Sequence, residues 1–417
     1  MKYLPAFMAA MTCSIGLTMA ATAETTVIHA GHLIAEPGKP EVINKSIIIE
    51  DGVIKDIKDG FVEGDTLIDL KDAWVMPGLI DMHTHITGVL NLAEPTAPQI
   101  AYAYIAPPAQ QVLKMIPRVK SLLMNGFTTV RVLGDQSGTA YYLRDAINEG
   151  AVEGPRMYVA EVQVAVDGGD MDPSNWDVRH EVEPFVSNRA SCTGVVECTK
   201  VVRLEVRRGA DVIKLRQAGL PAEDPNVAMV ETPEEIKAIV DTAHQLNRRV
   251  AAHVVGSPDY LHMVIEAGVD TIEHGPVDDT SIKLMKKHGT SYTPTLLAGK
   301  MIQYRFEDGQ AGVAKAYKAG VPIIFGSDLG IMSTDKVHEE FGLLAGAGMP
   351  PQEVLKAATV NAAAALGRAK DLGVIAIGAS ADIIAMPVNP VSNIEQVGEP
   401  GKVTFVMKEG TVFKGAK

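Results

Sequence analysis

The sequence predicts an α/β protein that consists of a TIM-like (β/α)8 barrel and a small β-sandwich built from both ends of the mature chain. Short apolar strands alternate with amphipathic helices over roughly 300 central residues, which is the pattern of a parallel barrel. Both ends instead contain β-branched runs interrupted by Gly, Pro and Asp-Gly, which is typical of strands joined by turns. With 417 residues, 47% of them hydrophobic, the chain is long enough for more than one core.

The first 23 residues are expected to be a secretory signal peptide. Lys2 gives a positive start, residues 4–20 are mostly apolar, and Ala21-Thr22-Ala23 supplies a small-x-small cleavage site. The mature chain should then begin at Glu24, and the protein should be exported, either to a periplasm or out of the cell. No later segment is apolar for long enough to cross a bilayer, so no membrane span is expected.

The charge and the cysteines restrict the possible partners and compartment. Loss of the leader removes one positive charge, Lys2, and changes the formal net charge from −13 to −14. An acidic, exported protein is a poor candidate for nucleic-acid binding. Cys192 and Cys198 remain after cleavage, and in an oxidising compartment they could form a small disulfide loop. The alternative is two free thiols.

Residues 24–75 and 371–417 are predicted to form the β-sandwich together. The first segment contains TTVIHAGHLIAEPGKPEVINKSIIIEDGVIKDI, and the second contains ADIIAMPVNP and KVTFVMKEGTVFKG. Both segments have the short runs and turn residues of a strand-rich domain. Residues 76–370, which lie between them, are assigned to the barrel.

The barrel is expected to contain eight strands with helices between them. The strands are predicted at residues 74–85, 128–134, 155–164, 210–216, 249–255, 270–275, 290–296 and 321–328. A helix over residues 232–246 should start with Thr232 as N-cap, Pro233 at the first helical position and Glu235 completing a capping box. A second helix, over residues 257–268, has the same Ser/Thr-Pro opening and ends at Gly268.

Two histidines stand one residue apart at the end of the first barrel strand, in the stretch LIDMHTHIT. Residues two apart on a strand point to the same face, so His83 and His85 should aim in one direction. Two neutral imidazoles that converge on one point are typical of a metal site. The alternative is a polar strand end with two solvated histidines.

Polar residues recur at the carboxyl ends of later strands, where the chemistry of such barrels is located. They are Lys214 on the fourth strand, His253 on the fifth, His274 on the sixth and Asp328 on the eighth. Taken singly, a strand-end His is more often a hydrogen-bonded structural residue, and a strand-end Asp is often a helix cap. Six such residues facing one mouth instead predict a metal site.

Lys214 is the unusual member of this set because it lies inside an apolar run. Burial of an ammonium group costs several kcal/mol unless its charge is removed or paired, and an ammonium cannot bind a cation. A lysine carbamylated by CO2 would solve both problems, since it is an anionic ligand able to bridge two metals. The alternative is an ion pair with a carboxylate such as Asp170. Two divalent ions with the carbamate, Asp328 and a bridging hydroxide would leave the mildly electrophilic site that a Lewis-acid hydrolase needs.

The chain resembles the amidohydrolase superfamily in a series of motifs that follow the family's order. They are PGLIDMHTHI, GFTTVR, GADVIKL, RVAAHVVG, AGVDTIEHG, FGSD and VNAAAALG…LGVIAIGASADII, and together they span nearly the whole mature chain. The closest resemblance is to the branch with imidazolonepropionase-like sequences. That branch includes Xaa-Pro and Xaa-Arg/Lys dipeptidases, N-acyl-amino-acid hydrolases and ochratoxin-hydrolysing enzymes.

This resemblance implies a site with two divalent metal ions, usually zinc. It implies that His83, His85 and Asp328 hold the first metal, that His253 and His274 hold the second, and that Lys214 bridges the two as a CO2-derived carbamate. Asp328 is also the expected proton shuttle. It ends the eighth strand, where it could touch both one metal and the bridging hydroxide.

The sequence departs from its relatives at positions where they contact the substrate or orient the site. Many relatives have His or Tyr where this chain has Val255, and Gly-Gly-His-Gly where this chain has Gly168-Gly169-Asp170-Met171. Many also have Asp directly after the arginine of the second strand, but here Val132 follows Arg131. These departures concern the identity of the substrate and not the metals.

Arg216 is the predicted receptor for a substrate carboxylate. It lies two residues after the buried lysine, so its side chain should point toward the same mouth. A guanidinium offers a planar two-pronged donor that matches a carboxylate. The alternative is an internal ion pair with Asp170 or Asp172. Asp170, Val255 and Tyr292 complete the set of candidate substrate-binding residues.

The function predicted on these grounds is hydrolysis, by metal-activated hydroxide, of an amide or peptide bond in a dipeptide or an N-acyl amino acid. The alternative is the same metal chemistry on a lactone, carbamate, cyclic amide or phosphoester. A non-catalytic barrel homologue is disfavoured because all six ligands are present, and a mononuclear deaminase would need no lysine on the fourth strand. The expected partners are a small-molecule substrate and further copies of the chain in a homo-oligomer.

Overall fold

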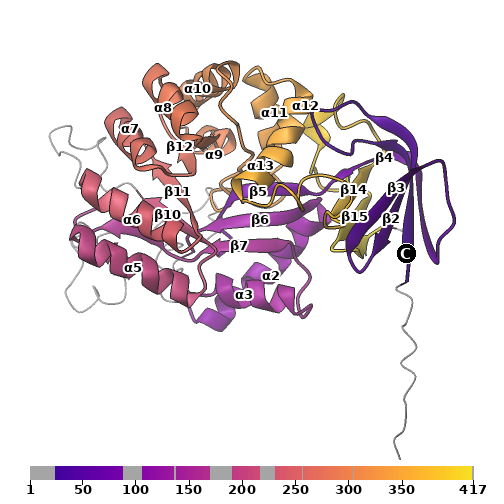
Figure 1. Cartoon of the computed structure of the whole chain (residues 1–417), viewed down its shortest axis with the longest axis horizontal. Coiled ribbons are helices and arrows are strands. Elements are labelled where there is room, and N and C mark those ends of the chain that lie inside the picture. The colour runs from indigo at the N-terminus through magenta and orange to yellow at the C-terminus, as the bar shows by residue number, and fades with distance from the viewer. Residues whose placement is uncertain are drawn as a thin grey trace, which may run out of the picture.

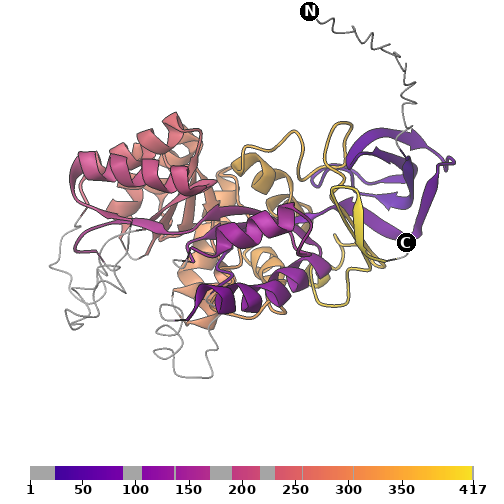
Figure 2. The ribbon, with the colours of Figure 1, turned by 90° about the horizontal axis from the view of Figure 1, so that it is seen from below.

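The computed structural model describes residues 24–87, 106–135, 138–169, 190–216, 231–255, 257–303 and 305–415. It shows an α/β protein with a mixed sheet at one end and a body of parallel strands covered by helices (Figures 1 and 2). Among the residues in these ranges, no helix has the length and apolarity needed to cross a membrane. The expected signal peptide, residues 1–23, lies outside the described residues.

The mixed sheet takes strands from both ends of the chain, as the sequence predicts. Its strands are β1 (Thr26–Leu33), β2 (Val42–Glu50), β3 (Val53–Asp59), β4 (Thr66–Pro77), β14 (Ile383–Met386), β15 (Phe405–Lys408) and β16 (Thr411–Lys414). They pair in the order β16-β15-β14-β4-β1-β2-β3. The antiparallel pair of β4 with β14 joins the two ends of the chain, drawn indigo and yellow in Figure 1.

This sheet encloses an apolar cluster of its own. Ile28 and Ala30 of β1, and Ile47 and Ile49 of β2, belong to this cluster and lie two residues apart on their strands, so each pair points to the same face. The turn after β2 also contacts the segment before β14, since Ala381 N donates to Gly52 O at 2.8 Å. The expected sandwich therefore takes the form of one continuous seven-stranded sheet that curls over its core. The domain boundaries at residues 75 and 371 stay a prediction.

The parallel strands follow one another in chain order. They are β5 (Leu79–Thr84), β6 (Phe127–Leu133), β7 (Arg156–Ala160), β8 (Gln163–Val166), β9 (Ser191–Cys192), β10 (Val212–Arg216), β11 (Arg249–Val254), β12 (Thr271–His274) and β13 (Ser291–Thr293). One sheet has the order β5-β6-β7, and the other has the order β13-β12-β11-β10-β8-β9. Every residue of β5 and β6 is buried, including the polar ones, as expected of strands that are covered on both faces.

Residues 321–329, expected to form the eighth strand, lie between the ends of these two sheets. Ile324 N donates to Tyr292 O of β13 at 2.8 Å, and Met82 N of β5 donates to Phe325 O at 3.0 Å. The segment makes only isolated bridges to its neighbours and no continuous ladder. It nevertheless brings β13 and β5 into one hydrogen-bonded series.

Two other predicted strands are each divided in two. The segment 74–85 breaks at Gly78, so that Trp74–Pro77 belongs to β4 of the mixed sheet. A Cβ at Gly78 would lie 2.1 Å from Thr128 Oγ1, so only glycine allows the chain to pass this close to β6. The segment 155–164 breaks after β7, which pairs with β6, whereas β8 pairs with β10.

Helices cover the outside of the parallel strands in Figure 1. They are α2 (Pro108–Met124), α3 (Ala140–Asn148), α5 (Gly194–Arg208), α6 (Pro233–Gln245), α7 (Pro258–Ala267), α8 (Asp279–His288), α9 (Leu296–Met301), α10 (Phe306–Lys318), α11 (Glu339–Gly346), α12 (Pro351–Ala357) and α13 (Val360–Ala365), with a 3-10 turn η2 (Ile394–Gln396). The predicted capping box of α6 is confirmed by reciprocal bonds between Thr232 and Glu235. In α7, the Ser257 side chain accepts a bond from Tyr260 N, and the helix ends at Gly268 in the left-handed conformation, as predicted.

Cys192 and Cys198 form a disulfide, which decides between the two alternatives left by the sequence. The bond joins β9 to the first turns of α5. Both residues are fully buried in the large apolar core between the strands and the helices. The disulfide therefore links the short strand β9 covalently to helix α5, which covers it.

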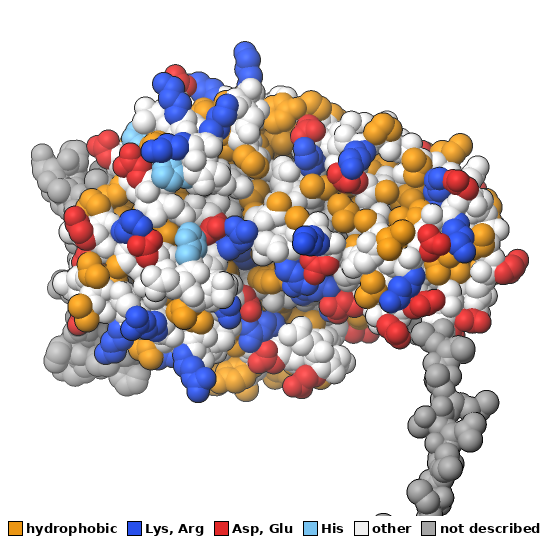
Figure 3. All heavy atoms as spheres, in the orientation of Figure 1, with side chains coloured by type: hydrophobic (Ala, Val, Ile, Leu, Met, Phe, Trp, Pro, Cys, Tyr) orange, Lys and Arg blue, Asp and Glu red, His pale blue; other side chains and the backbone are white. Residues whose placement is uncertain are grey.

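Arg156 connects the parallel strands to the mixed sheet. Its Nη1 lies 2.6 Å from Asp382 Oδ2, and its Nη2 lies 2.6 Å from Glu409 Oε1. Basic and acidic side chains are interspersed over the face seen in Figure 3, and exposed pairs of that kind contribute little to stability. The pair of Arg156 with Asp382 differs because Asp382 is only 5% exposed, so this contact lies inside the junction between the two parts.

Candidate metal centre

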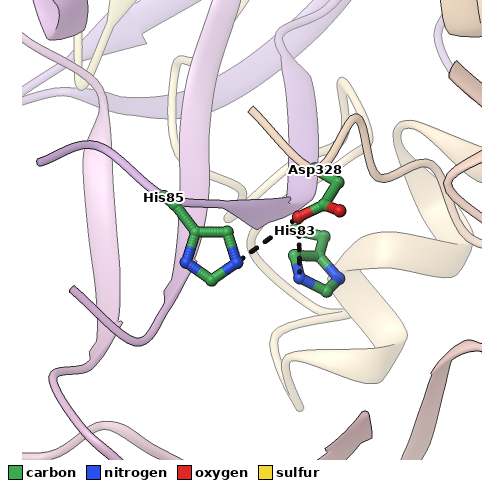
Figure 4. Close-up of side chains that lie close together, drawn as sticks. All are labelled: His83, His85 and Asp328. Atoms are coloured by element: carbon green, nitrogen blue, oxygen red, sulfur yellow. Dashed lines mark ion pairs between the residues drawn. The ribbon is translucent and has the colours of Figure 1, made fainter. Parts of the chain in front are cut away.

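His83, His85 and Asp328 converge where β5 meets the segment 321–329 (Figure 4). Asp328 Oδ1 lies 3.3 Å from His83 Nε2 and 3.4 Å from His85 Nε2. One ligand atom from each residue lies within 4.8 Å of the other two. His83 is fully buried and Asp328 is 6% exposed, whereas the side chain of His85 is 23% exposed. Two imidazoles and one carboxylate in this arrangement suit a divalent cation such as zinc.

Hydrogen bonds to the other ring nitrogen orient both histidines. His83 Nδ1 lies 2.9 Å from Glu273 Oε2, and His85 Nδ1 lies 2.8 Å from Gly134 O. Both partners are acceptors, so each Nδ1 carries a proton, and Nε2 is the ring nitrogen that faces the centre. Metal-bound imidazoles are held in this way in proteins, and the donor set therefore fits a metal ion.

A buried ion pair supports His83 from behind. Arg131 Nη2 donates to Glu273 Oε1 at 2.6 Å, and Arg131 Nη1 donates to Thr271 Oγ1 at 3.0 Å. Glu273 is 0% exposed and Arg131 is 2% exposed, so each charge depends on the other for compensation. This role of Glu273 was not predicted from the sequence. The available signal was a carboxylate inside the short apolar strand DTIEH, directly before His274.

Asp81 ties together the two segments that carry the metal-ligand candidates. Its Oδ1 accepts bonds from His83 N at 3.0 Å and Ser327 N at 3.1 Å, and its Oδ2 accepts a bond from Ser327 Oγ at 2.6 Å. Burial raises the pKa of Asp81 to about 7, against the opposing effect of these hydrogen bonds. Asp81 therefore connects β5 by hydrogen bonds to the segment that ends in Asp328. It too was missed as a functional residue, although it interrupts the apolar run before the histidines.

The other three predicted ligands lie beside this group. Lys214 Nζ on β10 lies 3.4 Å from His83 Nε2. The His274 ring lies 4.9 Å from the His83 ring and 4.7 Å from the His253 ring, measured between centroids. The structure thus brings all six sequence-predicted ligands to one place, from β5, β10, β11, β12 and the segment before Leu329. Their individual roles as ligands stay a prediction.

Burial determines the protonation of the imidazoles. It lowers the pKa of His274 to about 4, and it holds the pKa values of His83 and His253 well below the usual value. Burial alone would raise the pKa of Asp328, but its electrostatic interactions with the neighbouring histidines and its hydrogen bond with His85 lower it below its usual range. His85 differs, because the hydrogen bond and the charge of Asp328 raise its pKa although burial acts in the opposite direction. Neutral His83, His253 and His274 beside an ionised carboxylate are the protonation states that a metal site needs.

Lys214 has the protonation behaviour that carbamylation requires. It is 1% exposed, and burial lowers its pKa to about 7, although the charges of Glu273 and Asp328 act in the opposite direction. In a large fraction of the molecules, the Lys214 side chain is therefore a neutral amine near pH 7. A neutral amine is the form that reacts with CO2, whereas an ammonium does not.

The backbone is strained at two candidate ligands and at Thr295, whose hydroxyl contacts His274. His274, Thr295 and Asp328 have φ values of 64°, 49° and 57°. Left-handed backbone at such residues costs about 1–3 kcal/mol each and persists only where the surroundings hold it. At β12 the strain has a visible effect. Because Glu273 points inward, strand alternation would send His274 outward, and the left-handed turn returns its ring to the centre.

Arg216 lies at the edge of this centre, at the end of β10. Its Nη1 donates to Gln163 Oε1 of β8 at 3.0 Å. In the register between β10 and β11 it is paired with His253, so it stands next to a candidate metal ligand. Val255, which directly follows β11, is partly buried. Asp170 and Asp172, the alternative partners of Arg216, lie outside the described residues.

Tyr292 does not lie where a substrate-binding residue should lie. It is 1% exposed, and it belongs to the apolar core between the strands and the helices, close to Gly312 of α10. Its hydroxyl donates to Gly275 O at 3.5 Å. Because alternate residues of a strand face opposite sides, Tyr292 of β13 faces outward. The prediction of a substrate contact is therefore wrong for this residue.

The chain is similar to known proteins in both sequence and structure. Residues 74–413 match the profile of the Amidohydrolase family. Ochratoxinase of Aspergillus niger is 31% identical over 434 aligned positions, which cover 94% of this chain and 87% of that protein. Imidazolonepropionase of Chromobacterium violaceum is 26% identical over 378 positions, which cover 84% of each protein. The crystal structure of a Xaa-Pro dipeptidase with methionine bound in its active site is 32% identical, has a TM-score of 0.81, and covers 94% of this chain and 100% of that one. This similarity implies that the parallel strands form a TIM barrel.

Proposed function

The chain belongs to the amidohydrolase family, and from that premise we propose that it is a binuclear metal-dependent hydrolase that cleaves the amide bond of a dipeptide or an N-acyl amino acid. The observation that carries this proposal is the group of His83, His85 and Asp328, whose ligand atoms lie within 4.8 Å of one another. Around it lie the three further residues expected to complete a two-metal site.

The residues that would hold the metals divide into two sets. One ion would be held by His83, His85 and Asp328, the other by His253 and His274, with carbamylated Lys214 shared between them. When bound, the two ions, which we take to be zinc, would polarise the substrate carbonyl and lower the pKa of the attacking water. Glu273 and Gly134 O would keep the first two imidazoles in the tautomer that such binding requires.

Asp328 is the residue proposed to move the proton. Its carboxylate is ionised, because the surrounding histidines hold its pKa below the usual range. A low pKa makes this carboxylate a weak base, so it would take a proton only from a water that bound metal ions have already made more acidic, and it would deliver that proton to the nitrogen of the leaving amine. The bonds of Asp81 to His83 N and Ser327 N hold β5 and the neighbouring segment in the alignment that places Asp328 Oδ1 against both imidazoles.

Arg216 is the proposed receptor for the substrate carboxylate. Its position next to His253 puts a fixed cation at the edge of the metal centre. The bond to Gln163 Oε1 ties one guanidinium nitrogen to the wall formed by β8. The Xaa-Pro dipeptidase with bound methionine is a structural relative that accepts an amino acid, and an amino acid carries such a carboxylate. Hydrolysis of a lactone, carbamate, cyclic amide or phosphoester is the alternative.

Export of the protein is part of the same proposal. Residues 1–23 would be a cleaved leader, and the enzyme would act in the periplasm or outside the cell. The disulfide between Cys192 and Cys198 supports this location, because such bonds persist in oxidising compartments. Mass spectrometry of protein from the exporting cell should give a chain that begins at Glu24 and has both cysteines oxidised.

The substrate class can be tested with matched compounds. Purified protein should be screened against dipeptides and N-acyl amino acids, and the best substrate compared with its C-terminal amide. The wild type should prefer the free acid by about 1.5–3 kcal/mol, the usual value of a hydrogen bond to a charged group. Arg216→Ala should lose this preference, whereas Arg203→Ala on the exposed side of α5 should retain it. If Arg216→Ala keeps the preference, the carboxylate is bound elsewhere. If no amide is cleaved but a lactone or phosphoester is, the alternative chemistry replaces the proposal.

A further inference from the structure

Thr295 stands at the N-cap of α9 but does not cap the helix. Threonine is a favoured N-cap residue, yet the Thr295 side chain makes no capping bond. Its hydroxyl instead donates to Pro294 O at 2.8 Å and lies 2.5 Å from His274 Nδ1. Because the hydroxyl proton goes to Pro294 O, the oxygen accepts the proton of His274 Nδ1. The side chain is thus used to orient His274.

Glu340 of α11, and not Thr295, accepts the hydrogen bonds at the start of α9. Its Oε1 accepts a bond from Leu296 N at 3.0 Å, and its Oε2 accepts a bond from Leu297 N at 2.6 Å. These are the first two N–H groups of α9, which have no partner within the helix. Glu340 is 0% exposed, so the two bonds form away from water. Glu340, which lies 45 positions after Thr295 in the chain, therefore caps α9 in place of Thr295.

The backbone around Thr295 needs such support. Thr295 has a φ of 49° and His274 has a φ of 64°, both in the left-handed region. This region is unfavourable for a β-branched residue such as threonine, and surrounding contacts must hold it there. The two bonds from Glu340 act on the residues that directly follow Thr295. They therefore restrain the strained segment at its attachment to α9.

Apolar packing alone would not need a carboxyl group at this place. Leu297, Ala298 and Met332 form a small cluster against which Leu343 of α11 packs, so the two helices are already in apolar contact. Burial raises the pKa of Glu340 to about 8, although the hydrogen bonds from Leu297 N and Leu296 N act in the opposite direction because they favour the ionised carboxylate. A carboxyl group kept in so unfavourable a position is explained by the two N–H groups that it binds.

We propose that Glu340 is a positioning residue for His274: by capping α9 it frees the Thr295 hydroxyl to hold His274 Nδ1, so that His274 Nε2 is presented to a metal. This inference rests on the proposed function for the assignment of His274, with His253, to the second metal ion. It adds that the geometry of this second position is maintained by a residue that touches neither metal nor substrate.

The first test compares two carboxylates that make the same kind of contact. Glu340→Gln keeps the size of the side chain but replaces one oxygen by an amide NH2, which cannot accept a hydrogen bond, so above pH 8, where Glu340 is ionised, the variant leaves one N–H of α9 without its partner. Zinc binding to the metal-free protein, measured by competition with a chromogenic chelator, should be weaker by about 10- to 100-fold for the second equivalent and unchanged for the first. The control is Glu235→Gln, because Glu235 binds Thr232 N and Gly194 N with its two oxygens in α6. The control should lower the Tm without changing the affinity for either equivalent.

The second test asks whether Glu340 acts through Thr295. Thr295→Val removes the hydroxyl and keeps the shape, whereas Thr295→Ser keeps the hydroxyl. The serine variant should retain wild-type affinity, the valine variant should lose affinity for the second zinc, and Glu340→Gln should cause little further loss in the valine background. Additive losses, or an unchanged second affinity in Glu340→Gln, would overturn the inference. If Glu340→Gln does not fold, Glu340→Asp, which keeps both oxygens on a shorter side chain, replaces it in the same cycle. A wild type that binds one zinc equivalent would instead contradict the two-metal function itself.

Discussion

The Nδ1 atom of His83 and the Oε2 atom of Glu273 lie 2.9 Å apart, and neither residue is exposed to solvent. The same carboxylate binds Arg131 through its other oxygen, at 2.6 Å. A histidine, a glutamate and an arginine from three different strands are thus linked in one buried series. This series fixes the direction of His83 Nε2 before any metal binds.

We expect Glu273→Gln to weaken zinc binding at the His83 position by about 10- to 100-fold, the usual effect of losing the acceptor behind a metal-bound imidazole. The variant also leaves the Arg131 charge uncompensated, so the free energy of unfolding should fall by about 3–5 kcal/mol. Chelator competition and urea unfolding measure the two effects separately. Unchanged zinc affinity in a destabilised variant would show that Glu273 serves only the fold.

Protein purified without chelator should contain close to two equivalents of divalent metal, because six candidate ligands converge in the structure. Chelation should abolish activity, and added zinc should restore it. His85→Ala, which removes a ligand but not the Glu273 series behind His83, should retain less metal than the wild type. Elemental analysis provides the measurement. A reproducible single equivalent in fully active enzyme would contradict the two-metal arrangement.

Lys214→Ala should lose most of its activity, since no neutral or cationic side chain can replace an anionic bridge between two cations. Short carboxylic acids added together with metal should restore part of the activity by supplying two oxygens at the same place. Lys287→Ala on the exposed side of α8 serves as a control for the loss of a lysine that is not a candidate ligand. Full activity in Lys214→Ala, with normal metal content, would show that the lysine is not part of the metal bridge.

Asp328→Asn should lower kcat by several orders of magnitude while the fold is kept. An amide cannot accept the proton of the attacking water, although it can still bind a cation weakly. Measuring kcat and metal content together separates the two roles of Asp328. Loss of kcat at normal metal content identifies the proton transfer, and a parallel loss of both identifies a ligand. Near-normal turnover would require another group to move the proton.

Glu340 should make stability depend on pH in the metal-free protein. Burial raises the pKa of its carboxyl group from 4.5 to about 8, so between these pH values the folded state binds its proton more tightly than the unfolded state. The free energy of unfolding therefore falls as the pH rises through this window. Glu340→Gln removes this contribution, so its stability relative to the wild type should improve from pH 5 to pH 8. Urea unfolding in the presence of chelator measures the difference at each pH. A constant difference would mean that Glu340 has an ordinary pKa.

Much of the fold and of the site could be predicted from the sequence because it depends on neighbours in the chain. The capping box of Thr232 and Glu235 is a contact over three residues, and it is present as expected. The shared direction of Lys214 and Arg216 follows from the two-residue period of a strand. The alternation of strands and helices also predicted the parallel body, and the turn-rich ends predicted the sheet that joins them.

Contacts between distant segments decided the rest. Glu273 binds His83 across 190 residues of chain, and Arg131 binds Glu273 across 142. The inward direction of His274 opposes strand alternation, and it exists because a left-handed backbone turns the ring back. Tyr292 shows the opposite outcome, since alternation placed it among the helices. Local sequence patterns predict which side chains a strand presents on each face. Only the packed tertiary structure can stabilise a strained backbone residue or bury a charge beside its partner. Those long-range contacts therefore determine which of the candidate side chains reach the metal centre.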